Sequence, residues 1–309
     1  MQARDILVIL VTMGGIVAGV VWPGPAGGLQ PVTVYFLMGL LFLSFLRLDL
    51  KALLHPAPGV LREVLLWTLA KLILAPLILW GLAAWLLPEW ALPVLVLSAM
   101  SAGVSGPFFA AMLGADLVRV LMVVVATSLL VPFTLPALVR LLAGTETGIS
   151  FWEMFRLLAL VIFSPLALLI LIRRLAPRVL ERLGRVAFPV SLGLLFLISA
   201  AVFAPFGGYL LARPAQFLVA SLLAFGLSAA YLGLALLLTR LGGGRLDALT
   251  GQVALVYLNN VLGLVFAGRF LDTPSVLLTG CYLLPYYLAL LPLRWLSGRV
   301  PPAGHKRVG

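Results

Sequence analysis

Long apolar runs recur along the whole sequence and restrict its possible folds more strongly than any motif does. A helix needs about 20 mostly apolar residues to cross a hydrocarbon core about 30 Å thick. Ten runs of this kind stand between the charges, glycines and prolines. Their approximate limits are 6–21, 31–46, 64–87, 92–113, 117–139, 157–172, 186–206, 217–238, 249–268 and 275–293. We therefore predict an all-α integral membrane protein with ten transmembrane helices.

The composition excludes most soluble classes of protein. Charged residues make up 10% of the chain, so they cannot solubilise a sequence that is 63% hydrophobic. The net charge of +11 is assigned to the membrane edges, and we expect no nucleic-acid partner. With one cysteine, Cys281, and two histidines, His55 and His305, the chain has no internal disulfide and offers no metal or redox centre.

The basic residues predict the topology. The first run is long and no small-residue cleavage site follows it, so we interpret it as a span rather than a cleaved signal. Cytoplasmic loops are rich in Lys and Arg. With the N-terminus inside, sixteen basic residues fall on the cytoplasmic side, four fall outside, and Lys71 lies within a span. We expect a multi-pass monomer of the plasma or inner membrane with both termini cytoplasmic.

An internal repeat divides the chain into halves. Residues 129–144 resemble residues 283–298, and Pro132 matches Pro285 at an offset of 153. This offset contains five spans, an odd number, so the second half is predicted to be inverted in the membrane. The expected units are 1–146 and 147–309. The alternative is that two leucine-rich spans resemble each other by chance.

The fourth and ninth runs correspond under this offset, and both are interrupted at mid-depth. Pro107 cannot donate a helical hydrogen bond to the carbonyl of Gly103, and Gly106 precedes it. Asn259 and Asn260 place two amides at the equivalent depth. Paired broken helices indicate a transport site. The alternative is a proline kink combined with asparagine hydrogen bonds between helices.

Lys71 lies deep in the third run, about eight residues from either end. A charge at this depth costs about 2.5 to 3.5 kcal/mol on insertion scales. The ammonium could bind an anionic substrate, gain and lose a proton, or replace a bound cation. Alternatively it is a structural lysine satisfied by carbonyls of a broken neighbouring helix. All ten acidic residues fall at or near span ends, so no acidic residue within the spans neutralises it.

Taken together, these features resemble the bile acid:sodium symporter family, within the superfamily that also holds arsenite and auxin carriers. The segment 36–54, which contains most of the second run and the loop after it, has the family's phenylalanine, methionine, glycine and leucine pattern before a charged loop. Pro76, the end of the fourth run at 114–116 and the segment 126–132 follow in family order. The arsenite branch is disfavoured because its fourth-helix cysteine has no counterpart here.

The resemblance implies two inverted five-helix repeats. Helices three to five and eight to ten would form a core domain in which the broken helices four and nine cross. Helices one, two, six and seven would form a panel domain. An organic anion would bind between the two domains, and alternating access would move it across the membrane, driven by sodium.

The sodium ligands implied by the family are mostly missing. For the first site, the fourth-helix pair falls on Gly106 and Pro107, and the ninth-helix glutamate falls on Leu255. The fifth-helix hydroxyls persist as Thr127 and Ser128.

For the second site, the ninth-helix glutamine falls on Asn259, followed by Asn260, and the third-helix glutamine falls on Lys71. We hypothesise that Lys71 acts as a built-in cation, donating to ninth-helix carbonyls at 255–258 and to Asn259. The candidate substrate- or ion-binding residues are Lys71, Ser105, Gly106, Pro107, Thr127, Ser128, Gln252, Asn259 and Asn260.

The predicted function is secondary transport of a small organic anion without classical sodium coupling, as uniport, exchange or proton-linked transport. One alternative is sodium symport through shifted ligands. Another is a non-transporting sensor or scaffold derived from a transporter. We predict no enzyme, because the spans contain no acidic cluster, paired aspartates or histidine–glutamate motif. The basic segment 173–185 is interpreted as a topology signal with incidental lipid contact. The glycines at 242–244 are interpreted as a hinge, and 301–309 as a disordered tail.

Overall fold

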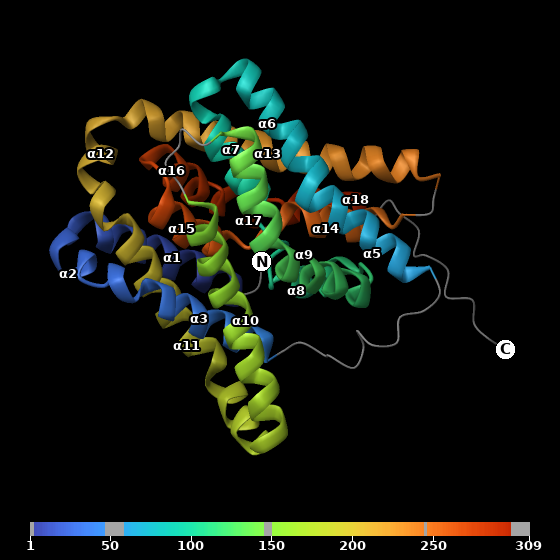
Figure 1. Ribbon diagram of the computed structural model, residues 1–309, viewed down its shortest axis with the longest axis horizontal. Helices are drawn as coiled ribbons and strands as arrows, with labels where there is room; N and C mark the ends of the chain where they lie inside the picture. The colour runs from blue at the N-terminus through green and yellow to red at the C-terminus, as the bar shows by residue number, and fades with distance from the viewer. Residues whose placement is uncertain (1–2, 47–58, 145–149, 244–245, 298–309) are drawn as a thin grey trace.

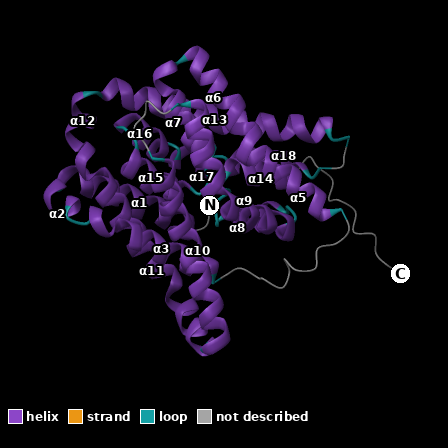
Figure 2. Ribbon diagram, viewed as in Figure 1, coloured by secondary structure: helices purple, strands orange, loops and turns teal. Residues whose placement is uncertain are grey.

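The computed structural model describes residues 3–46, 59–144, 150–243 and 246–297. Helices are the only regular elements within these ranges, as Figure 2 shows. The all-α prediction is confirmed for this part of the chain. His55, His305, Gly244, the tail 301–309 and the proposed boundary at 146/147 lie outside the described residues.

Seven helical stretches are long and apolar enough to cross a membrane. They are Pro23–Phe45, Val60–Leu86, Leu117–Leu142, Phe151–Leu175, Pro177–Tyr209, Pro214–Leu241 and Thr273–Trp295. Three shorter apolar helices accompany them, at Ile6–Val21, Pro88–Ser98 and Asn260–Phe270. The chain is therefore a multi-pass membrane protein. The count of ten spans remains a prediction, since two of the ten predicted runs are interrupted.

Four long helices pack on one another at one side of the molecule (Figure 1). They are α1 (Ala3–Val21), α3 (Thr33–Phe45), α10 (Phe151–Leu175) and α11 (Pro177–Phe203). Helices α1 and α11 approach each other closely at Gly15, where a Cβ would lie 2.6 Å from the carbonyl oxygen of Phe196. Gly19 approaches Ala200 in the same way one turn later. Small residues four apart permit such close contact between helices in a bilayer.

The remaining helices form a second group around two interrupted helices. They are α5 (Val60–Leu69), α6 (Ala75–Leu86), α7 (Ala91–Ser98), α8 (Gly106–Leu113), α9 (Leu117–Leu142), α13 (Pro214–Leu241), α14 (Ala248–Val256), α15 (Asn260–Phe270), α16 (Thr273–Cys281), α17 (Leu283–Leu288) and α18 (Leu290–Ser297). The groups meet where α9 packs on α10 and where α15 packs on α3 and α11. Short helices α2 (Pro23–Gly27) and α12 (Gly207–Ala212) lie at the ends of longer ones.

Aspartates set the starts of three helices in the second group. Asp116, Asp247 and Asp272 are the N-cap residues of α9, α14 and α16, and each side chain accepts a hydrogen bond from the backbone N–H three residues later. An N-cap aspartate satisfies one of the free N–H groups of the first turn. These acidic residues therefore lie at helix ends, as the sequence indicates.

The interruption of the fourth run is centred earlier than Gly106 and Pro107. Helix α7 ends at Ser98 and α8 begins at Gly106, so the open segment is 99–105. Pro107 is the second residue of α8. Proline is well tolerated in a first turn, where its missing N–H would have no helical partner. Pro107 therefore marks where the second half-helix starts rather than where the first opens.

Candidate functional site

The two open segments cross each other as a short antiparallel bridge between Ala102 and Leu258. The N–H of Gly103 donates to the carbonyl oxygen of Tyr257 at 2.6 Å, and the N–H of Asn259 donates to that of Ser101 at 2.8 Å. Each interruption therefore satisfies backbone groups of the other, as the low dielectric of a bilayer requires. Only glycine suits position 103, because a Cβ there would lie 2.5 Å from the carbonyl oxygen of Leu258.

The crossing frees a carbonyl at the end of α7. In a continuous helix the N–H of Ala102 would donate to the carbonyl oxygen of Ser98. Here that N–H donates to the hydroxyl of Thr127 on α9, at 3.1 Å. The Thr127 hydroxyl in turn donates to the carbonyl oxygen of Val123, at 2.8 Å. The candidate Thr127 therefore binds the crossing to α9, and the Ser98 carbonyl is left for another donor.

Lys71 is that donor. Its Nζ lies 2.8 Å from the carbonyl oxygen of Ser98, and the side chain is fully buried. The ammonium also lies 5.1 Å from the centre of the Tyr231 ring on α13, within the range of a cation–π contact. The hypothesis named carbonyls at 255–258 and Asn259 as its acceptors. Lys71 instead donates its hydrogen bond to the carbonyl oxygen of Ser98 on α7. That carbonyl is available because the N–H of Ala102 donates to Thr127.

The backbone around Lys71 is a π-helical turn, Ala70–Leu74, between α5 and α6. The N–H of Ala75 reaches back five residues to the carbonyl oxygen of Ala70. Pro76 follows directly and has no N–H to continue the ordinary pattern. Single π-turns inside α-helices are rare and often mark functional sites.

Two contacts join α5, which leads to Lys71, to the start of α14. The Glu63 carboxylate of α5 accepts a hydrogen bond from the N–H of Asp247, at 2.5 Å, just before α14. One turn further along both helices, Trp67 covers Gly251 so closely that a Cβ would overlap its ring. Lys71 lies about one turn beyond Trp67 along its helix, and Leu255 lies about one turn beyond Gly251 along α14.

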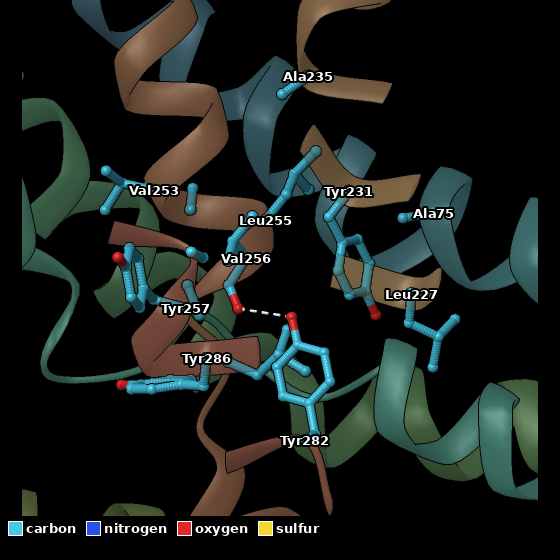
Figure 3. Close-up of a cluster of buried hydrophobic side chains, with 14 of the residues drawn as sticks. Ala75, Leu227, Tyr231, Ala235, Val253, Leu255, Val256, Tyr257, Tyr282 and Tyr286 are labelled. Atoms are coloured by element: carbon cyan, nitrogen blue, oxygen red, sulfur yellow. Dashed lines mark hydrogen bonds between the residues drawn. The ribbon is translucent and has the colours of Figure 1, made fainter. Parts of the chain in front are cut away.

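The equivalent end of α14 has a different partner. The hydroxyl of Tyr282 donates to the carbonyl oxygen of Val256 at 2.8 Å, shown as the dashed line in Figure 3. The Tyr282 and Tyr231 rings meet edge to face, with centroids 6.3 Å apart. Lys71 and Tyr282 thus satisfy the C-terminal carbonyls of the two half-helices that end at the crossing, and Tyr231 contacts both.

The surroundings of Gly106, at the expected first sodium site, are apolar. Gly106 is buried, and a Cβ built on it would lie 3.4 Å from methyl groups of Val120 and Val124 and 3.8 Å from one of Val253. Pro107 supplies no side-chain oxygen. Ser128 is buried, and its hydroxyl has no hydrogen-bond partner among the described residues.

The polar candidates of the ninth run are all buried. The Asn259 side chain caps α15 by accepting from the N–H of Leu262 at 3.3 Å. The Asn260 amide donates to the carbonyl oxygen of Thr279 at 3.0 Å. Neither amide atom of Gln252 has a hydrogen-bond partner in the described part of the chain. Asn259 therefore caps α15 and Asn260 links α15 to α16, whereas Gln252 and the Oδ1 of Asn260 have hydrogen-bonding capacity to spare.

Ser105 lies apart from Lys71, in a cluster of aromatic rings. Its hydroxyl shares a hydrogen bond with the hydroxyl of Tyr286 on α17. The rings of Phe109 and Tyr257 stack with centroids 3.9 Å apart, and Tyr286 stands edge-on to both. Figure 3 shows Tyr257 and Tyr286 beside each other.

Sequence reasoning missed the carbonyl of Ser98 and the tyrosines Tyr231, Tyr282 and Tyr286. Tyrosines in otherwise aliphatic spans were a usable signal, since a buried hydroxyl needs a partner. The sequence contains no sign of the free Ser98 carbonyl, because every residue type has a backbone carbonyl. The described residues contain no group of three or more His, Cys, Asp or Glu side chains placed to hold a metal ion.

A family model described as the Sodium Bile acid symporter family matches residues 35–213, more than half of the chain. The match includes Lys71, the α7–α8 interruption and Thr127, and it ends before α14. No curated protein matches the chain.

Proposed function

Because the chain belongs to the sodium bile acid symporter family, we propose that it is a secondary carrier that moves a small organic anion without coupling to sodium. Membership in a family of transporters accounts for a multi-pass membrane protein that handles a small molecule, and it argues against an enzyme. The observation that carries the absence of sodium coupling is the buried ammonium of Lys71 on the carbonyl of Ser98.

The proposed architecture is ten spans in two inverted repeats, 1–146 and 147–309. Two interruptions that cross with antiparallel backbone bonds support this symmetry. The proposed panel consists of α1, α3, α10 and α11, and the other helices are the core. Their separate packing supports this division. Substrate would bind where the groups meet, and their relative movement would alternate access to the site.

The family name implies a sodium ion, but the residues present do not fit one. Sodium takes oxygen ligands. The first expected position is lined by methyl groups of Val120, Val124 and Val253 around Gly106. At the second expected position, Lys71 and Leu255 replace the glutamine and the glutamate that the family resemblance implies, and an ammonium repels another cation strongly in a low dielectric. No step of the proposed transport is therefore assigned to sodium.

Lys71 supplies a positive charge at the crossing in this scheme. It is buried and engaged by a carbonyl and a ring, which supports a structural cation rather than a direct substrate ligand. The C-terminal end of α7 carries partial negative charge that a cation stabilises. A cation bound covalently to the chain stays in place throughout the cycle, so loading from solution is not needed.

The test is uptake of radiolabelled organic anions into proteoliposomes, with and without a sodium gradient. We expect uptake by the native protein to be unchanged by the gradient, and uptake by Lys71→Gln to fall at least tenfold. The exposed substitution Arg240→Gln is the matched control and should retain native uptake. Strict sodium dependence of the native protein would overturn the proposal and favour symport through shifted ligands. Absence of flux for every anion would favour a non-transporting sensor or scaffold.

A further inference from the structure

The α10–α11 hairpin ends in a strongly basic tip that extends beyond the rest of the described helices (Figure 1). Helix α10 has Arg173 and Arg174 in its last turn, and α11 begins one residue after the break at Ala176. Five arginines and one acidic residue, Glu181, lie within residues 173–185. The sequence alone suggested a topology signal here, since it does not show how the charges are arranged in space.

The structure arranges three of these arginines as a stripe along α11. At about 100° per residue, Arg178, Arg182 and Arg185 fall within an arc of about 60°. All three are exposed. Leu180 and Ala187 lie on the opposite face, where Ala187 is buried and Leu180 packs against the apolar core. The stripe therefore points away from the helices that α11 packs on.

No acidic side chain in the described part of the chain neutralises the stripe. The ion pairs of the described residues both involve Arg119, so Arg178, Arg182 and Arg185 make none. Glu181 lies at one edge of the stripe, is itself exposed and forms no ion pair with it. An unpaired row of guanidinium groups is complementary to phosphate, which arginine binds through two parallel hydrogen bonds.

The depth of the stripe indicates which phosphate it meets. The apolar run of α10 ends at Ile172 and that of α11 starts at Val186, so the stripe lies just beyond the hydrocarbon core. Exposed apolar side chains flank it, with Leu175, Val179 and Val186 being 76%, 44% and 46% exposed. A basic face with apolar residues beside it is typical of a helix segment at the level of lipid headgroups.

We propose that Arg178, Arg182 and Arg185 form a binding site for the headgroups of anionic phospholipids in the leaflet at this end of the molecule. The bound lipids hold the α10–α11 hairpin at a fixed depth. This site is independent of the transported anion and of Lys71, so its test and the transport test have separate outcomes.

The experiment is native mass spectrometry of the purified protein in detergent, titrated with phosphatidylglycerol or phosphatidylcholine. The native protein is expected to retain phosphatidylglycerol in preference to phosphatidylcholine. Because each arginine near an anionic surface contributes roughly fivefold, the triple variant Arg178→Gln, Arg182→Gln and Arg185→Gln should bind phosphatidylglycerol on the order of 100-fold more weakly. Gel filtration and thermal unfolding establish that the variant is folded.

The matched control removes the same charge from the other end of the spans, with Arg140→Gln, Arg156→Gln and Arg269→Gln. This control should bind phosphatidylglycerol as the native protein does. Equal loss in both triple variants, or no loss in the stripe variant, would overturn the proposal. Displacement of the lipid by an equal concentration of inorganic phosphate would also overturn it, because the site would then bind phosphate alone.

Discussion

At the scale of single residues, Lys71 shows how a charge is held inside a span without an acidic partner. The ammonium is fully buried, donates to the Ser98 carbonyl at 2.8 Å and faces the Tyr231 ring. Charge-assisted hydrogen bonds stabilise a fold by about 1.5 to 3 kcal/mol, comparable with the cost of inserting the charge. The geometry therefore explains why this lysine is tolerated.

Restoring the ligands implied by the family should restore a response to sodium. In the double variant Lys71→Gln and Leu255→Glu, an amide replaces the ammonium and a carboxylate replaces the leucine. We expect sodium chloride, but not potassium chloride, to raise the unfolding temperature of this variant, because an ion that binds only the folded state stabilises it.

Thermal unfolding in detergent, followed by tryptophan fluorescence, provides the measurement. The native protein and the single variant Leu255→Glu are the controls, and neither should respond to sodium, since Lys71 remains in both. Equal stabilisation of the native protein by sodium would show that Lys71 does not replace the ion.

At the scale of helices, each interruption is stabilised by the other helix. The segments 99–105 and 257–259 satisfy each other's backbone groups through the bonds at Gly103 and Asn259. Neighbouring helices complete the arrangement, α9 through Thr127 and α16 through Thr279. Neither half-helix pair would be stable in a bilayer without the other, since unsatisfied backbone groups cost several kcal/mol each there.

A methyl group at Gly103 should push the segments 99–105 and 257–259 apart. The added Cβ would lie 2.5 Å from the Leu258 carbonyl oxygen and 3.0 Å from that of Tyr257, and both acceptors are backbone atoms with little freedom to move. We expect Gly103→Ala to lower the free energy of unfolding by about 1 to 3 kcal/mol, the usual cost of overpacking, and to reduce transport.

The free energy change is measured by denaturation in detergent. Gly233→Ala on α13 is the control, because a Cβ at Gly233 meets no atom within 4 Å. This control should be as stable as the native protein or slightly more so, since alanine favours a helix. Similar stability of the two variants would mean that the crossing tolerates a wider separation.

At the scale of the whole molecule, the proposed orientation connects the basic hairpin tip with the cytoplasm. With the proposed five spans in each repeat and a cytoplasmic N-terminus, α10 would start outside and end inside. We expect Ser150→Cys to react with a membrane-impermeant maleimide on intact cells, and Glu181→Cys to react only after the cells are permeabilised. Both positions are exposed, so accessibility reports the side of the membrane.

Both variants are made with Cys281→Ser, which removes the buried native thiol. The Cys281→Ser protein without a new cysteine gives the background level of labelling. Labelling of Glu181→Cys on intact cells would contradict the orientation and would move the arginine stripe to the outer leaflet.

Much of this fold was predictable, because insertion into a bilayer depends on the local concentration of apolar residues. Most of the described helices start and end within about four residues of the predicted runs, although α10 and α11 start six and nine residues earlier, and the ninth run opens at Asn259 as expected. Lys71 was identified because a charge inside an apolar run is anomalous whatever surrounds it. The family resemblance also followed from local patterns, and the family match confirms it.

The contacts that Lys71 and the interrupted segments make depend on the tertiary structure. The Ser98 carbonyl is available only because Ala102 turns to Thr127, and Lys71 meets it across 27 positions of sequence. The shift of the interruption to 99–105 has the same origin, since the segment opens where Tyr257 and Leu258 approach it. Hydropathy and helix-breaking residues act over one or two turns, whereas a hydrogen bond requires two atoms within about 3 Å, and only the packing of distant helices brings them together.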